Sequence, residues 1–473
     1  MPDKPHILIL MTDQQRADAM SCAGHPVLRT PNMDRIAAEG VRFENAVTTC
    51  PLCMPARAAF VSGLYNHNHH IWRNRGRLPA EDETFFHHLR RAGYQTAYIG
   101  KSHFYEHAAG DHLRRHEAYM HARGIDYVHE TTGPWATAKT GSYLTDAWGE
   151  ATWSAFRADY EKRRGTPWAA WPSPLSEDDF PDSHVGRQAV EFVEGRPDDR
   201  PVCLFAAFGG PHEPFDAPGR YATLYDPASV PPAIPPEPIE GLSPAAGEWL
   251  GARRRFLRGE ERVPPELVAP AAAGYFGKIA LIDHWVGQVL DAFAARGWLE
   301  DTLVVFWSDH GEMLGDHGWF FKNVFYESSV RVPLLLRWPG RVPAGAVRPQ
   351  PAETIDVFDT LLAAAGCEPS ARSFGRSLLP AARDPAAAHR DAAFSEVTCR
   401  EARPQAGPAR ATMVRTDHWK YVVADTSEPL MLFDLADDPA EQRNLAADPG
   451  SAGVRADLDR RICGWLLQTQ VSQ

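Results

Sequence analysis

The chain has 473 residues, 44% of them hydrophobic and 23% charged, which is enough to bury a large core in one or two domains. Its formal net charge of -12 argues against nucleic acid or an anionic membrane surface as the main partner, although a local cationic pocket could still bind a small anion. No uncharged apolar run approaches the ~20 residues that a membrane-spanning helix needs.

Short, nearly continuous apolar segments recur along the chain, each followed by polar residues and then by a helical pattern. Runs of this length are typical of strands in a parallel sheet that helices cover on both faces. The predicted strands are residues 6–11, 96–100, 202–208, 302–307 and 332–338. Their alternation with helical segments predicts an α/β fold with a large mixed, mostly parallel sheet between layers of helices.

Capping residues, apolar spacing and proline content predict helices, a surface loop and a second domain in other parts of the chain. Asn32 as an N-cap and Gly40 as a stop predict a helix over 32–40, and apolar spacing predicts a longer one over 275–297. Proline-rich residues 217–265 predict a surface excursion. After about residue 380 the sequence changes to Ala- and Arg-rich loops followed by strand-like segments. This change predicts a catalytic domain over 1–380 and, over 381–473, a small C-terminal α+β subdomain of antiparallel strands and a last helix. One continuous domain is the alternative.

Polar side chains follow four of the predicted strands. In open α/β sheets, ligands bind outside the carboxyl ends of the strands, so these side chains are expected to meet at one edge. A lone histidine or aspartate there would more often be a solvated loop residue, but four strands together favour a site. In chain order the residues are Asp13 and Gln14, Lys101 and His103, His212, and Asp309 and His310.

A metal cluster is expected from Asp13, Gln14, Asp309 and His310. Carboxylate and amide oxygens are hard ligands suited to Ca²⁺, Mg²⁺ or Mn²⁺, and the imidazole favours Mn²⁺ slightly. We expect one divalent ion, Ca²⁺ first and Mn²⁺ as the alternative. Cations and proton donors on Lys101, His103, His212 and Lys322 would then hold an anionic group beside that ion.

The stretch CPLCMPARAAFVSG, residues 50–63, predicts a short helix that presents an unusual cysteine. Pro55 suits the first turn of a helix, and Gly63 suits its end. Cys53 is therefore expected just before a helix N-terminus, where free N–H groups favour anions. Arg57, one turn inside, would be close enough to contact whatever residue 53 carries.

Residues alone leave the role of Cys53 open. Most cysteines are small buried thiols, and that is the simplest interpretation. A catalytically idle binding protein could instead hold zinc, with ligands at tolerable spacing in Cys50, Cys53, His67, His69 and His70. A third interpretation, in which residue 53 is a catalytic nucleophile, comes from a family resemblance.

Five motifs in order resemble those of the type I, formylglycine-dependent sulfatases of the alkaline phosphatase superfamily. The stretch Cys53-Met-Pro-Ala-Arg57 matches the C-x-P-x-R signature, and GYQTAYIGKSH over 93–103 matches the second signature. The TDQ after the first strand, PHEPF around His212 and SDHGEMLGDHGWFFK ending at Lys322 match as well. Later segments, FGRSLLP and LFDLADDPAEQRNL, extend the resemblance over almost the whole chain.

The resemblance implies an alkaline-phosphatase-like fold and an arylsulfatase-like hydrolase of sulfate monoesters, aryl or alkyl. In the family, the cysteine is oxidised to formylglycine (3-oxoalanine) by a formylglycine-generating enzyme, and the hydrated aldehyde is the nucleophile. The implied metal ligands are Asp13, Gln14, Asp309, His310 and residue 53. The implied catalytic residues are Cys53, Arg57, Lys101, His103, His212 and Lys322, and the substrate-binding ones are Asn74, Lys101, His212 and Lys322.

Two departures favour a second enzyme class. Many family members have Asp-Asp at Asp13-Gln14 and Asp-Asn at Asp309-His310, and both variants resemble the phosphonate monoester hydrolase and phosphodiesterase branch. That branch carries Tyr-x-Thr where this chain has Lys101-Ser-His103, and the Lys-x-His pair favours sulfate esters. Residues 104–174, rich in aromatic side chains, are candidates for shaping the substrate pocket.

Partners and location follow from the same observations. We expect a small anionic ester as substrate, the maturation enzyme as a transient partner, and neither nucleic acid nor membrane; self-association is left open. The opening MPDKPHILILM lacks a secretory pattern, and the seven cysteines are scattered apart from Cys50 and Cys53. A cytoplasmic protein is therefore expected.

Overall fold

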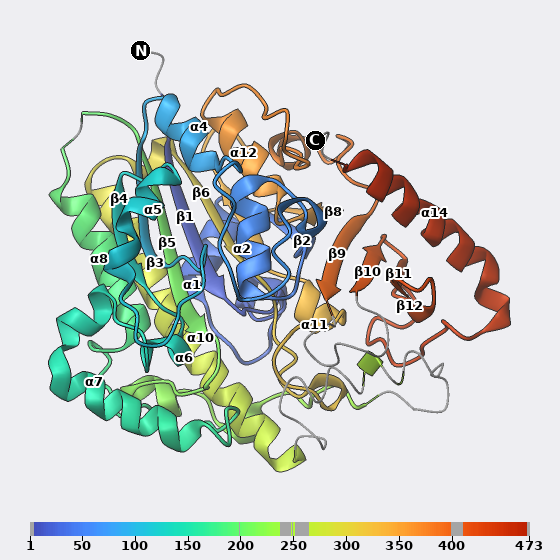
Figure 1. Cartoon of the computed structure of the whole chain (residues 1–473), viewed down its shortest axis with the longest axis horizontal. Coiled ribbons are helices and arrows are strands. Elements are labelled where there is room, and N and C mark those ends of the chain that lie inside the picture. The colour runs from blue at the N-terminus through green and yellow to red at the C-terminus, as the bar shows by residue number, and fades with distance from the viewer. Residues whose placement is uncertain are drawn as a thin grey trace.

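A computed structural model of the chain describes residues 4–197, 199–236, 247, 249–250, 264–398 and 410–470. Its centre is an eight-stranded sheet in the order β4-β3-β5-β1-β6-β7-β2-β8 (Figure 1). These strands are β1 (His6–Asp13), β2 (Val41–Val47), β3 (Gln95–Lys101), β4 (Tyr127–Thr131), β5 (Val202–Pro211), β6 (Thr302–Ser308), β7 (Leu334–Arg337) and β8 (Ala346–Glu353).

The sheet is mixed and mostly parallel, as predicted. β1 pairs in parallel with β5 on one side and β6 on the other, and β3 pairs in parallel with β4 and β5. β7 runs antiparallel to both β6 and β2, although β2 and β8 are parallel to each other. All five predicted strands are confirmed, and the apolar run expected over 332–338 supplies the reversed strand β7.

Helices cover both faces of the sheet because the side chains of β1 alternate between two cores. Ile7 and Ile9 pack in the core under helices α2, α4 and α12, whereas Leu8 and Leu10 pack in the core under α1, α8 and α10. In Figure 1, α2 and α4 lie in front of the sheet and α10 lies behind it. The long helices are α1 (Pro31–Ala38), α2 (Cys53–Ser62), α7 (Tyr143–Arg163), α8 (Pro181–Gly195), α10 (Pro265–Ala295), α12 (Asp356–Ala364) and α14 (Ala452–Gln468). Shorter ones are α3 (Asn66–His69), α4 (Phe85–Arg91), α5 (Glu117–Ala122), α6 (Pro134–Thr137), α11 (Glu327–Val330) and α13 (Leu379–Arg383).

Two helix boundaries differ from the predicted ones. α1 begins at Pro31 with Thr30 at its N-cap, so Asn32 is not the cap. The Asn32 amide instead donates a hydrogen bond to the backbone oxygen of Asp283 at 3.0 Å, a contact with α10 that the local pattern could not predict. α10 starts ten residues earlier than the predicted 275 and contains Pro270. The proline-rich excursion before it is described to residue 236, and most of residues 237–263 lie outside the described part.

The C-terminal part forms a second, antiparallel sheet in the order β12-β11-β10-β9, with α14 on its outer side (Figure 1). Its strands are β9 (Ala393–Thr398), β10 (Arg410–Arg415), β11 (Trp419–Ala424) and β12 (Pro429–Asp434). The predicted antiparallel strands and last helix are confirmed. The domain boundary at residue 380 stays a prediction.

A buried ion cluster joins the two sheets. Arg390, just before β9, contacts Asp356 of α12 through Nη2 at 2.5 Å and Glu353 of β8 through Nη1 at 3.1 Å. The second oxygen of Glu353 accepts a hydrogen bond from the backbone N–H of Phe394 at 2.6 Å. Both carboxylates are fully buried and need polar partners. Arg390 contacts both of them, and His389 Nε2 lies 3.1 Å from Asp356 as well.

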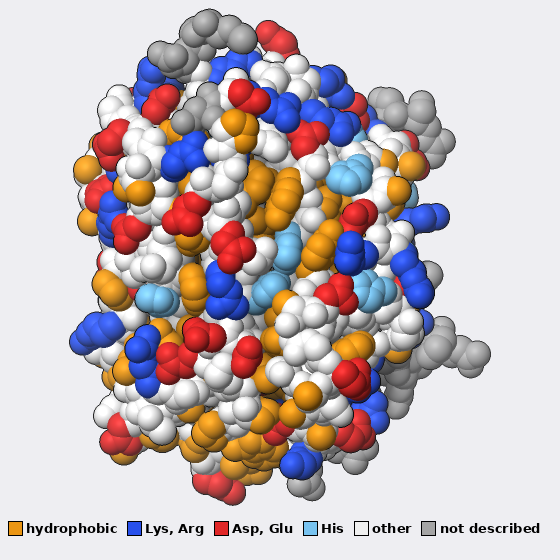
Figure 2. Space-filling view, turned by 90° about the vertical axis from the view of Figure 1, so that its left-hand side faces the viewer, with side chains coloured by type: hydrophobic (Ala, Val, Ile, Leu, Met, Phe, Trp, Pro, Cys, Tyr) orange, Lys and Arg blue, Asp and Glu red, His pale blue; other side chains and the backbone are white. Residues whose placement is uncertain are grey.

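The surface agrees with the acidic but otherwise ordinary composition. On the face drawn in Figure 2, acidic and basic side chains are interspersed. Among the helices that the structure describes, none is both long enough and apolar enough to cross a membrane.

Replacing Arg390 by alanine is expected to lower the free energy of unfolding by about 3–5 kcal/mol, because it removes the guanidinium that contacts both buried carboxylates. The matched control is Arg461→Ala, which removes a pair with Asp391 whose side chains are 38% and 86% exposed. That change should cost about 0–1 kcal/mol. Urea unfolding followed by circular dichroism measures both, and equal costs would contradict a role for Arg390 in joining the sheets.

Candidate active site

Four strands deliver the predicted site residues to one edge of the large sheet. Asp13 ends β1 and Lys101 ends β3, His212 follows β5, and Asp309 follows β6. Since β3, β5, β1 and β6 are adjacent and parallel, their carboxyl ends lie side by side. The predicted meeting of these side chains at one edge is confirmed.

Helix α2 presents Cys53 to this edge. Cys53 is the first residue of the helix rather than the residue before it, with Leu52 as N-cap, and the helix ends at Gly63 with φ of 72°. The next backbone N–H, that of Met54, is capped by the Asn74 side chain, whose Oδ1 accepts a hydrogen bond at 3.0 Å. Asn74 thus satisfies one of the free donors of the helix start.

Cys53 lies in a buried cluster with metal-ligand character. One ligand atom from each of Asp13, Cys53, Asp309 and His310 lies within 4.8 Å of the others. The Cys53 Sγ is 3.2 Å from His310 Nε2 and 3.8 Å from Asp13 Oδ1. Burial together with repulsion from Asp13 raises the pKa of the Asp309 carboxyl, so a cation placed here would relieve both effects. Two carboxylates and an imidazole form a donor set that fits a divalent ion.

Gln14, the remaining predicted metal ligand, lies beside this cluster. Its backbone N–H donates to Asp309 Oδ1 at 3.1 Å. Its side-chain oxygen accepts a hydrogen bond from Lys322, and its Nε2 donates to Glu213 at 2.9 Å and to Glu312. The side chain of Gln14 therefore links the cluster to Lys322, and its role as a ligand stays a prediction.

Arg57 clamps the two aspartates. Its Nη2 is 2.8 Å from Asp13 Oδ2 and its Nε is 2.9 Å from Asp309 Oδ2, and all three side chains are fully buried. Its Nη1 donates to the backbone oxygen of Lys101. The hydrogen bonds of the guanidinium thus go to the two carboxylates and to the backbone of Lys101. The expected contact of Arg57 with the group that residue 53 carries stays a prediction.

Cationic side chains surround the Cys53 sulfur. Burial alone would raise the pKa of the thiol, but Lys101, Lys322 and His310 outweigh it and hold that pKa well below its usual range. Lys101 also forms an ion pair with Asp13. His103 makes a hydrogen-bonding contact with Cys53, and burial lowers the pKa of its imidazole to about 3. The site therefore favours negative charge at residue 53.

His212 and Lys322 form a second group across from Lys101. Lys322 Nζ lies 2.7 Å from His212 Nε2 and 3.5 Å from Glu213 Oε2. His212 Nδ1 lies 2.8 Å from the backbone oxygen of Glu213. Two proton-bearing side chains are thus held together, with a carboxylate to compensate the lysine charge.

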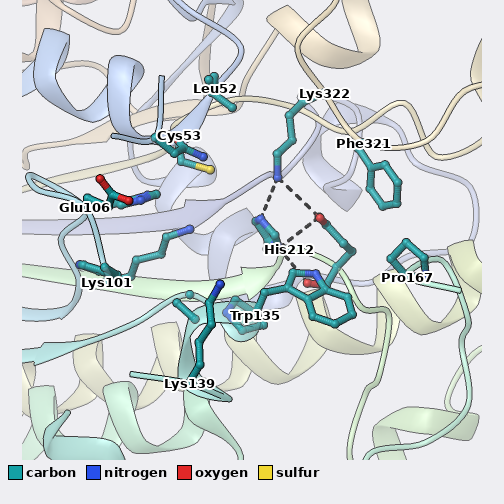
Figure 3. Close-up of a pocket in the computed structure, with 17 residues that line it drawn as sticks. Leu52, Cys53, Lys101, Glu106, Trp135, Lys139, Pro167, His212, Phe321 and Lys322 are labelled. Carbon is teal, nitrogen blue, oxygen red and sulfur yellow. Dashed lines mark hydrogen bonds and ion pairs between the residues drawn. The ribbon is translucent and has the colours of Figure 1, made fainter. Parts of the chain in front are cut away.

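The two groups face each other across a cavity of about 470 Å³ (Figure 3). In the figure Lys101, Lys322 and the Cys53 sulfur point into it from three different elements. Asn74 and His103 line it too, as predicted, and so do Trp135 and Lys139 from the 104–174 region. This volume suits a small organic ester.

Comparison with known proteins agrees with this geometry. The profile of the family named Sulfatase matches residues 5–367, and that of the C-terminal region of N-sulphoglucosamine sulphohydrolase matches residues 315–467. The chain belongs to the sulfatase family. This family lies in the alkaline phosphatase superfamily, and the predicted enzyme class, a sulfuric ester hydrolase, is confirmed at that level.

Relatives of the enzyme have different named activities. A choline-sulfatase of Rhizobium meliloti (strain 1021) is 30% identical over 98% of this chain and 88% of its own length. The multifunctional alkaline phosphatase superfamily protein PehA of Trinickia caryophylli is also 30% identical, over 98% of this chain and 95% of its own. The crystal structure of the phosphonate monoester hydrolase of Agrobacterium radiobacter superposes with a TM-score of 0.79 at 25% identity, covering 99% of this chain and 96% of that one.

The zinc interpretation is wrong for this sulfatase-family enzyme. Among the described residues, the His, Cys, Asp and Glu side chains close enough together to hold a metal are Asp13, Cys53, Asp309 and His310, so Cys50 and the histidines of the 67–70 segment do not form a zinc site with Cys53. Both ring nitrogens of His67 are engaged, with Glu396 and Thr469 at 2.9 Å each. His69 Nδ1 accepts from the backbone of Ile71 at 3.0 Å.

Two acidic residues of the enzyme's site were not among the predicted ones. Glu213 lies between Gln14 and the His212–Lys322 pair, and Glu312 accepts from Gln14 and from the backbone N–H of Phe321 at 2.6 Å. Their adjacency to His212 and to Asp309-His310 was the available signal. Sequence alone does not tell such supporting acids from solvated ones.

Replacing Asp309 by alanine is expected to abolish hydrolase activity and the binding of a divalent ion at this cluster, since it takes away one of its two carboxylates. Elemental analysis of purified protein gives the metal content, and near-ultraviolet circular dichroism verifies the fold. The control is Cys50→Ser, which should keep both metal and activity. Loss of metal from Cys50→Ser with retention in Asp309→Ala would contradict the assignment.

Proposed function

We propose that this enzyme hydrolyses a sulfate monoester, aryl or alkyl, through residue 53 after its conversion from cysteine to formylglycine. The supporting observation is the placement of the Lys101 and His103 pair beside Cys53, with His212 and Lys322 facing it across one cavity. Such an arrangement supplies cations for the sulfate oxygens and proton carriers on both sides of the reacting atom.

Residue 53 would react as a hydrated aldehyde, which offers two hydroxyl groups on one carbon, one to attack sulfur and one to allow release of sulfate. His103 is placed to remove a proton from residue 53. The hydrogen-bonding contact of its imidazole with Cys53 places it beside that residue. Lys101 would bind non-bridging sulfate oxygens, and His212 or Lys322 would protonate the departing alcohol.

A divalent ion would be held by Asp13, Gln14, Asp309 and His310 together with residue 53. When bound, it would supply Lewis-acid stabilisation of the sulfate and lower the pKa of a coordinated hydroxyl. Ca²⁺ is the first choice and Mn²⁺ the alternative. Arg57 would keep the two carboxylates in place by its contacts with Asp13 and Asp309.

Hydrolysis of phosphonate monoesters or phosphodiesters is the second candidate. It is favoured by Gln14 and His310 at positions where many sulfatases have Asp and Asn, and by the 0.79 TM-score with a phosphonate monoester hydrolase. The Lys101-Ser-His103 sequence favours sulfate. Both candidates use the same residue 53 and the same cavity.

The remaining partners belong to the same proposal. Maturation requires a formylglycine-generating enzyme that reads the segment around Cys53 before folding, because Cys53 and Arg57 are fully buried afterwards. Among the described residues no disulfide is formed, which accords with the cytoplasm as the proposed location.

The peptide that contains residue 53 tests the proposal directly. In active protein produced with the maturation enzyme, tandem mass spectrometry should find an aldehyde oxygen in place of the thiol at residue 53. Cys50, in the same peptide, should remain alkylatable and serves as an internal control. Turnover of an aryl sulfate should rise in proportion to the converted fraction and vanish in Cys53→Ala. Full activity in protein whose residue 53 is entirely thiol would refute the mechanism.

A further inference from the structure

One wall of the active-site cavity is apolar and aromatic. Trp135, Pro167 and Phe321 lie together on one side of the cavity in Figure 3, beyond His212. Trp135 is half-buried, and its ring packs edge-on against Tyr160 with centroids 5.2 Å apart. A flat indole held in this way offers a surface on which an aromatic ring packs favourably.

Lys139 adds a cation to the mouth of this cavity. Its side chain is exposed, and in Figure 3 its ammonium points into the cavity from the segment that follows Trp135. Lys101 is paired with Asp13, and Lys322 is in contact with Glu213. Within the described ranges, by contrast, the Lys139 ammonium has neither an ion pair nor a hydrogen bond. Its charge is therefore available to a ligand.

Glu106 lies on another side of the same cavity, near Lys101, and is exposed (Figure 3). A carboxylate there repels an anion, whereas Lys139 attracts one. The two charges therefore favour one orientation of a charged substrate, with any second negative group on the Lys139 side.

We propose that the cavity selects aryl esters whose leaving group carries a second anionic substituent, such as a carboxylate, which Lys139 binds while the ring packs against Trp135. This inference rests on the proposed function for the position of the ester, which Lys101 and Lys322 hold beside residue 53. A leaving group with a quaternary ammonium, as in choline, would bring a cation to Lys139 and is therefore disfavoured.

The test uses two esters of nearly equal size, 3-carboxyphenyl sulfate and 3-carbamoylphenyl sulfate, and the ratio of their kcat/KM values. The Lys139→Met change keeps length and removes charge, so the carboxylate-to-carboxamide ratio should fall about two- to fivefold, as expected for a solvent-exposed ion pair. Comparing ratios between variants cancels the different intrinsic reactivities of the esters. Glu106→Gln should raise the same ratio.

The matched control is Lys162→Met on α7, an exposed lysine outside the cavity lining, which should leave the ratio unchanged. An unchanged ratio in Lys139→Met would overturn the inference even if sulfate hydrolysis holds. If only phosphonate esters are hydrolysed, the proposed function fails, and the corresponding pair of arylphosphonate monoesters gives the same ratio test.

Binding supplies a readout that needs no turnover. Calorimetry of 3-carboxyphenyl sulfate with metal-loaded Cys53→Ala protein should give an affinity that weakens by about the same two- to fivefold when Lys139→Met is added. Equal affinities with and without Lys139 would contradict the inference, whichever ester proves to be the substrate.

Discussion

The site depends on the burial of two carboxylates side by side. Asp13 ends β1, Asp309 directly follows the adjacent strand β6, and both are fully buried. Two such charges repel each other and lose their hydration, so they are stable only when cations compensate them. Arg57 supplies one cation at 2.8 and 2.9 Å, and Lys101 supplies another. The remaining position, towards Cys53 and His310, suits the divalent ion of the proposal.

The need to compensate these two buried carboxylates also fixes the position of α2 relative to the sheet. Arg57 lies one turn after Cys53, so its contacts with the two aspartates anchor the start of the helix above the strand ends. Asn74 caps that helix start from the cavity side. Residue 53 is thereby held over the strand ends by backbone and charge together, which is the kind of support that a reacting group needs.

Sequence patterns predicted correctly those parts of the structure that are determined by residues close together in the chain. Apolar runs that end in Asp13, Lys101, His212 and Asp309 predicted both the sheet and its active edge, because strand direction sets where their side chains meet. The antiparallel direction of β7 could not be predicted in this way, because an apolar run does not indicate the direction in which its strand lies in the sheet. Asn32 was misjudged as a cap because its partner Asp283 is distant in sequence. For the same reason the sequence could not show the contacts of Arg57 with the two aspartates.

Specificity depends on the least predictable part of the site. Trp135 and Lys139 come from the segment after β4, where aromatic and charged residues could equally have faced solvent. Their place in the cavity is set by how that segment packs over the sheet edge. The proposed chemistry at residue 53 could thus be inferred from sequence motifs, whereas the residues proposed to bind the leaving group could be found only from the tertiary structure.

The most direct measurement is the comparison of kcat/KM for an aryl sulfate and for the matching arylphosphonate monoester, on one metal-loaded preparation with residue 53 fully converted. The account predicts that the sulfate ester is hydrolysed with the higher kcat/KM, because Lys101 and His103 face residue 53. A clear preference for the phosphonate ester over every sulfate ester tried would contradict it.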